Sequence, residues 1–330
     1  MGRFVAGDAP ELDRALADAL AAIGAEIVAM RVPSLAGVVL GGGYGRGEGG
    51  ARGELKVQSS KLKVESSKSD VACRLSNDLD FFAITRDGTT DADAAAVAKA
   101  LEPLSRRWSE KLGIDVDFTG RTPWRLRHDQ ERLMVQELIH GYVDVVGEKG
   151  EVLFAGIERR EPSDLPWMEA ARLLMNRGMG LLFARVEKNV DFTNRNINKC
   201  ILGAGDARLI ANRRYRWRAP ERAEALRDQM YRNAVAWKFR PEESAVCDWS
   251  AARDVWRAAY EEVMEIGARE GALGRSLRQA ARWVVRRRTL GAPASFGQNC
   301  TVRVLRGVAR CVETRSAIPP SLRRDWEIFN

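Results

Sequence analysis

The chain has 330 residues, of which 45% are hydrophobic and 30% charged, and its formal net charge is +8. This length predicts about two domains, each large enough to bury a core without disulfides or structural metals. The composition excludes collagen-like, coiled-coil and wholly disordered proteins, and no window reaches the roughly 18 apolar residues of a membrane span. The first residues lack the apolar segment of a secretory signal, and the dispersed cysteines are typical of reduced thiols. We therefore expect a cytoplasmic protein that does not enter a membrane.

The charge is distributed unevenly along the chain. Residues 1–150 have a net charge of -3, whereas residues 151–330 have one of +11. A basic half of this kind could face a polyanion such as tRNA, or the phosphates of a nucleotide. The alternative is that arginine-rich helices are simply solvated, because acidic residues are interleaved with the arginines.

The first part of the chain predicts alternating helices and strands. Helical periodicity covers 9–30, and the apolar run 36–40 predicts a buried strand that leads directly into the glycine-rich segment 41–50. Two copies of a polar heptad follow, and we interpret about 53–70 as a low-complexity insertion, with a β-hairpin as the alternative. Beyond the insertion we predict strands over 77–85 and 113–119, helices over 90–111 and roughly 128–140, and short strands over 142–146 and 152–155.

The predicted secondary structure changes near residue 160 from alternating helices and strands to helices alone. Long helices rich in Leu, Ala, Arg and Trp are predicted over 164–188, 194–213, 219–239, 249–270 and 274–289. We therefore predict an α/β (α+β) domain over 1–160, followed by an all-α domain over 161–330.

Two pairs of acidic residues lie on predicted strands, Asp78 with Asp80 and Asp115 with Asp117. Side chains alternate along a strand, so the two carboxylates of each pair project from one face. Mg²⁺ is the natural partner of such carboxylates, because it prefers oxygen ligands and keeps waters for substrate phosphates. A third carboxylate opposite Asp78 and Asp80 would complete a two-metal site that activates the attacking oxygen and holds the triphosphate. The spacing does not distinguish Asp115 from Asp117 for that place.

The glycine-rich segment supplies the complementary feature. Glycines permit positive φ angles and a close approach of the backbone, so that successive N–H groups can hold phosphate oxygens. Arg46 adds a positive charge that could reach the β- or γ-phosphate. The segment is neither a Walker A loop, since no Gly-Lys-Ser/Thr follows, nor a good dinucleotide-binding fingerprint. Carboxylates and a phosphate-binding loop together favour phosphoryl or nucleotidyl transfer.

These motifs carry a family resemblance. Residues 42–48 read GGYGRGE and residues 77–80 read NDLD. Together they resemble the nucleotidyltransferase superfamily of DNA polymerase beta, and within it the signature of the uridylyltransferases that modify the PII nitrogen-signalling protein. The resemblance covers about residues 36–120 and implies a mixed sheet flanked by helices, with a helical domain behind it.

The resemblance also implies site residues and cofactors. Mg²⁺ and a nucleoside triphosphate, ATP or another, would be bound. Gly42 and Gly43 would hold phosphate, and Tyr44, at a position where many members have a phosphate-binding serine, is a further predicted nucleotide-binding residue. Asp78, Asp80 and Asp117 are the predicted metal ligands, with Asp115 the open alternative for the third carboxylate. In the family only a few residues separate the loop from the acidic strand, whereas here nearly thirty do.

Further candidates lie outside this core motif. Lys199 and Asp206 are seven residues apart in a predicted helix and therefore share a face. Lys199 is a candidate for binding the nucleotide, and Asp206 for acting as a base or holding an acceptor amine. Arg177 and Glu48 are secondary candidates. A salt bridge is the alternative explanation for Lys199 and Asp206.

We therefore expect a Mg²⁺-dependent nucleotidyltransferase that moves an NMP from an NTP to an acceptor hydroxyl or phosphate and releases pyrophosphate. The acceptor is left open between a small molecule, a protein and an RNA. The alternative is a catalytically inactive nucleotide-binding or interaction module of the same fold, such as one partner of a toxin–antitoxin pair. The long insertion between loop and acidic strand motivates that alternative.

Overall fold

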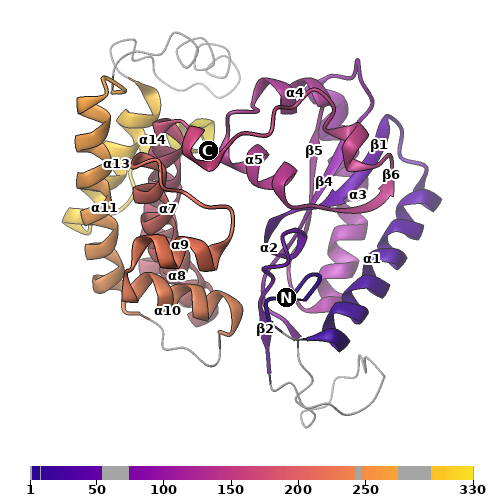
Figure 1. The fold of residues 1–330 in the computed structure, drawn as a ribbon, viewed down its shortest axis with the longest axis horizontal. Helices are drawn as coiled ribbons and strands as arrows, with labels where there is room; N and C mark the ends of the chain where they lie inside the picture. Colours follow the sequence, from indigo (N-terminus) through magenta and orange to yellow (C-terminus); the bar gives the residue numbers. More distant parts are fainter. Residues whose placement is uncertain (1, 8, 54–73, 242–246, 274–298, 330) are drawn as a thin grey trace. The chain divides into compact units, whose positions relative to one another are not determined.

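The computed structural model describes residues 2–7, 9–53, 74–241, 247–273 and 299–329 (Figure 1). Most of the expected insertion and the whole helix predicted over 274–289 lie outside these residues. The chain forms two compact units. The first consists of Met1–Arg160 and Lys238–Ser244, and the second of Glu161–Trp237 and Ala245–Asn330. The chain thus returns to the first unit after residue 237, a crossing that the sequence pattern did not indicate.

A four-stranded mixed sheet forms the centre of the first unit. Its strands are β1 (Leu35–Leu40), β4 (Leu79–Thr85), β5 (Val116–Arg121) and β6 (Val143–Gly147), in the order β5-β4-β1-β6. β4 and β5 are parallel, whereas β1 is antiparallel to both of its neighbours. The mixed sheet predicted from the sequence is therefore confirmed. A separate antiparallel pair, β2 (Ala51–Arg52) and β3 (Arg74–Leu75), brings together the residues on either side of 54–73.

Both faces of the two central strands, β1 and β4, are largely buried, which agrees with their apolar sequences. Val38 and Phe81 belong to a core that α1 (Pro10–Met30) and α3 (Asp91–Leu112) cover. Val39 and Phe82 belong to a second core on the opposite face. That core is covered by three short helices, α4 (Pro123–His128), α5 (Leu133–His140) and α6 (Gly150–Leu153).

Local signals explain where the helices of the first unit begin and end. α3 starts with a capping box, because Thr90 and Asp93 satisfy each other's backbone N–H groups, and it ends at Gly113 with φ 68°. Of the helix predicted over roughly 128–140, only 133–140 forms one continuous helix, α5, whereas 129–132 are not helical and α4 precedes them. α4 begins at Pro123 because the Thr122 hydroxyl accepts a hydrogen bond from the Arg125 amide at 3.0 Å.

The prediction of a strand over 152–155 is wrong. Residues 152 and 153 belong to the helical turn α6, and residues 154 and 155 form the turn that follows it. Val152 is 59% exposed, so the apolar run that favoured a buried strand is not buried along its whole length.

Helices make up the second unit. After the 3₁₀ turn η1 (Pro162–Asp164) they are α7 (Trp167–Val186), α8 (Val190–Ala211), α9 (Ala219–Leu226), α10 (Gln229–Phe239), α11 (Trp249–Arg269), α13 (Cys300–Thr314) and α14 (Pro320–Phe329). The last two residues of α10 belong to the first unit. The helix predicted over 219–239 is broken in two, because Arg227 adopts a left-handed conformation with φ 57°. The sequence reading missed α13 and α14. Across the described ranges, no helix is both long and apolar enough to cross a membrane.

Candidate functional site

The antiparallel pairing of β1 with β4 brings the two main motifs together. The last residue of β1, Leu40, pairs with Phe81 near the start of β4. The glycine-rich segment that follows β1 therefore lies beside the first acidic pair, although nearly thirty residues separate them in sequence. The Gly41 amide donates a hydrogen bond to the Asp80 carbonyl oxygen at 2.8 Å, which fixes this contact.

The glycine segment forms a helical turn, α2 (Gly42–Gly45), against the first carboxylate. Gly42 has φ 61°, and a Cβ atom built on it would lie 2.2 Å from Oδ2 of Asp80. No other residue type fits here without moving that carboxylate. The amides of Gly42 and Gly43 lie in the first turn, where N–H groups have no acceptor within the helix. The turn therefore places backbone donors next to an acidic side chain.

The parallel pairing of β4 with β5 brings the two acidic pairs together. Asp80 pairs in register with Asp117, so these side chains stand side by side on one face. Asp78 and Asp115 each lie one residue before their strand, and not within it as the sequence pattern predicted. The Asp115 carbonyl oxygen accepts a hydrogen bond from the Leu79 amide at 2.9 Å. The four acidic residues thus all lie at the edge of the sheet where the glycine segment lies.

The electrostatics of this cluster favour a cation. Partial burial raises the pKa of Asp117, and the charges of Asp115 and Asp78 raise it further. Among the residues that the structure describes, no group of three or more His, Cys, Asp and Glu side chains is arranged to hold a metal ion. The donor set nevertheless has the chemistry of a Mg²⁺ site, because it consists of carboxylate oxygens that repel one another without a cation.

The side chain of Tyr44 is a structural anchor of the glycine segment. The ring is 1% exposed and packs over Gly49, where a Cβ atom would lie 2.0 Å from Cδ1 of Tyr44. The hydroxyl donates to the Gly50 carbonyl at 2.7 Å and accepts from the amides of Ser76 and Asn77. Tyr44 therefore joins the glycine segment to the chain just before β4.

Arg46 and Glu48 are also engaged within the protein. Glu48 is 1% exposed and lies 3.7 Å from Nε of Arg46 and 3.1 Å from Nζ of Lys238. Nη1 of Arg46 lies 3.5 Å from Glu137 on α5. These ion pairs hold the end of the glycine segment in place. The sequence reading did not identify Glu137 or Lys238, since no local pattern links either residue to the loop.

The N-terminal residues pack against the same segment. The Ala6 amide donates to the Gly49 carbonyl at 2.9 Å, and the Gly49 amide donates to the Phe4 carbonyl at 3.0 Å. The Asp13 carboxylate on α1 accepts hydrogen bonds from the backbone amides of residues 3–5. Asp13, which lies outside the predicted motifs, therefore helps to hold the N-terminal residues against the glycine segment.

The remaining predicted residues belong to the second unit. Lys199 and Asp206 both lie on α8, and Arg177 lies on α7, where its side chain packs over Gly203. Asp206 lies 2.9 Å from Nε of Arg222 and accepts a hydrogen bond from the Tyr231 hydroxyl at 2.5 Å. The salt bridge considered as the alternative explanation for Asp206 is therefore present.

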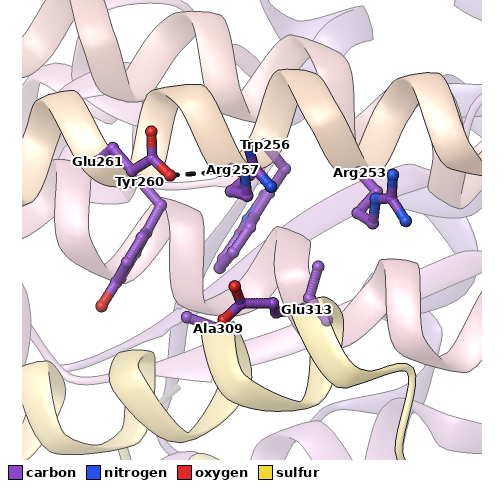
Figure 2. Close-up of a pocket in the computed structure, with 8 residues that line it drawn as sticks. Arg253, Trp256, Arg257, Tyr260, Glu261, Ala309 and Glu313 are labelled. Carbon is purple, nitrogen blue, oxygen red and sulfur yellow. Dashed lines mark ion pairs between the residues drawn. The ribbon is translucent and has the colours of Figure 1, made fainter.

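The second unit also contains a cavity between α11 and α13. Figure 2 shows the side chains that line it, which are Arg253, Trp256, Arg257, Tyr260, Glu261, Ala309, Val312 and Glu313. The rings of Trp256 and Tyr260 stack with centroids 5.5 Å apart. None of the residues predicted to be functional lines this cavity.

Comparison of the chain with protein-family models gives no match, and comparison with curated proteins gives none either. The case for a function therefore depends on the geometry of the site.

Proposed function

We propose that this protein is a Mg²⁺-dependent nucleotidyltransferase of the DNA polymerase beta type. It would transfer an NMP from an NTP to an acceptor hydroxyl or phosphate and release pyrophosphate. The observation that carries the proposal is the contact between Gly42 and the Asp80 carboxylate, because it joins the glycine turn to the acidic cluster. Backbone donors for phosphate and carboxylates for a divalent cation are the two requirements of this chemistry.

The register of the strands supports specific roles for the carboxylates. Asp78, Asp80 and Asp117 would hold Mg²⁺, and Asp117 is favoured over Asp115 because it pairs directly with Asp80. When bound, Mg²⁺ supplies charge stabilisation for the triphosphate and the leaving pyrophosphate. The amides of Gly42 and Gly43 would bind phosphate oxygens that lie beside these carboxylates.

The proposed reaction forms one bond and breaks another at the α-phosphorus. The acceptor oxygen attacks this atom, the bond to the bridging oxygen of the β-phosphate breaks, and pyrophosphate leaves with the electron pair. Where the acceptor is a hydroxyl, its proton passes to solvent water.

The test is transfer of label from each α-³²P nucleoside triphosphate in the presence of Mg²⁺ and cell extract. We expect wild-type protein to label an acceptor and Asp80→Asn to abolish labelling. Asp87→Asn is the matched control, because Asp87 lies just after β4 and its side chain is 73% exposed. Equal labelling by wild type and Asp80→Asn would refute the proposal.

Nucleotide binding without transfer is the second candidate. The observation that favours it is that Tyr44 and Arg46, both predicted to bind nucleotide, are engaged within the protein. A binding module would be stabilised against thermal unfolding by Mg²⁺ and NTP, since a ligand that binds the native state stabilises it. Stabilisation by NTP without any transfer of label would select this candidate.

A further inference from the structure

A second charged feature lies in the loop that joins α8 to α9 (Figure 1). Residues 212–218 read NRRYRWR, with four arginines and no acidic residue. All four arginines are exposed, whereas Tyr215 is buried and Trp217 is half-buried. The loop therefore presents its positive charge outward and an aromatic ring between two of the arginines.

A buried arginine fixes the backbone of this loop. Arg222 is 4% exposed and donates hydrogen bonds to the carbonyl oxygens of Arg216 and Trp217, both at 3.0 Å. It also donates to the Tyr215 hydroxyl at 3.1 Å, while Asp206 balances its charge. The exposed arginines thus stand on a backbone that is held in place, which lowers the entropic cost of binding.

The hydrogen bonds of Arg214 and Arg216 orient these two side chains without neutralising them. Arg214 donates to the Ala225 carbonyl oxygen, and Arg216 donates to the carbonyl oxygen of the preceding residue. A carbonyl oxygen accepts a hydrogen bond but carries no net charge. Arg213 is paired with Glu270 at 3.7 Å, but both side chains are well exposed, so this pair contributes little.

We propose that the α8–α9 loop, residues 212–218, binds single-stranded nucleic acid. Guanidinium groups match phosphate oxygens through paired N–H donors, and they carry the salt-dependent part of such binding. The partly exposed Trp217 ring offers a base a stacking surface next to these donors. A lipid surface fits less well, because arginines rather than apolar side chains dominate the exposed part of the loop.

The proposal does not rest on the proposed function, because it concerns binding in the absence of NTP and Mg²⁺. The experiment measures fluorescence anisotropy of labelled single-stranded RNA and DNA of mixed sequence, with the full chain, over a range of salt concentrations. RNA and DNA are separate arms, since both present the same phosphodiester chemistry. Polyglutamate competes in a third arm.

The test variant is Arg214→Gln combined with Arg216→Gln. The matched control is Arg257→Gln combined with Arg323→Gln, two exposed arginines on α11 and α14 that are 56% and 61% exposed. Both variants lose the same charge, and neither changes a buried side chain. Circular dichroism checks that each variant keeps its helix content.

We expect the loop variant to bind at least about tenfold more weakly. The slope of log K against log salt concentration should fall in magnitude by roughly 1.4, the value for two phosphate contacts to a single strand. The control should bind nearly as wild type does. Absence of nucleic-acid binding by wild type, equal loss in both variants, or competition by polyglutamate as strong as by RNA would each overturn the proposal.

Discussion

Replacement of Gly42 by alanine tests the geometry of the site most directly. Two costs are expected from this change. The left-handed conformation with φ 61° costs an L-residue about 1–2 kcal/mol. The new Cβ atom would also lie 2.2 Å from Oδ2 of Asp80, so this carboxylate must rotate away. Moving an exposed side chain off its rotamer costs only about 0.5–1.5 kcal/mol.

The substitution should therefore reduce stability moderately and function severely. In a unit of this size each kcal/mol lowers the melting temperature by about 2–4 °C, so a total cost of about 1.5–3.5 kcal/mol predicts a decrease of roughly 3–14 °C. A carboxylate displaced by about 1 Å is expected to lower the transfer rate by about two orders of magnitude. Differential scanning fluorimetry measures the first quantity, and label transfer with the four NTPs measures the second.

Gly113→Ala is the matched control. Gly113 belongs to the same unit and has φ 68°, but a Cβ atom there meets nothing within 4 Å. This variant has the conformational cost without the contact to a carboxylate, so its melting temperature should fall while transfer persists. The reasoning is refuted if Gly42→Ala and Gly113→Ala retain equal transfer activity, because the contact with Asp80 would then have no consequence.

Three further substitutions test the supports of the two units. Asp13→Ala removes the acceptor of three backbone amides and should destabilise the protein by about 2–3 kcal/mol in urea unfolding, whereas Asp18→Ala on the exposed side of α1 should change little. Arg222→Met leaves the Asp206 carboxylate without its buried partner and should cost about 3–5 kcal/mol, and a loss below about 1 kcal/mol would contradict this. Hydrogen bonds from the backbone and side chain of Thr90, the N-cap residue of α3, lower the pKa of Asp93. The Asp93 carboxylate should therefore stabilise the folded protein at pH 7, and this contribution should disappear as the pH falls below the ordinary aspartate range. A difference in melting temperature between wild type and Asp93→Asn that stays constant from neutral to acidic pH would contradict this assignment.

The sequence by itself determined the elements whose signals are local. The apolar periodicity of 9–30 and the apolar run before the glycines correspond to α1 and β1. Thr90 and Gly113 mark the two ends of α3, because capping depends on residues within one turn of the helix end. The acidic pairs could likewise be recognised, since a spacing of two is visible without knowledge of the fold.

Only the tertiary structure decided how these pieces meet. The alignment of Asp80 with Asp117 depends on strand register, which is set by pairing between segments far apart in the chain. The same holds for the roles of Tyr44 and Arg46, because a motif does not reveal whether a side chain faces a ligand or the protein's own backbone and acids. The pairing of Lys238 with Glu48 joins residues 190 positions apart, and no local pattern encodes such a contact. Local sequence therefore specified the chemical groups, and long-range packing selected which of them share one site.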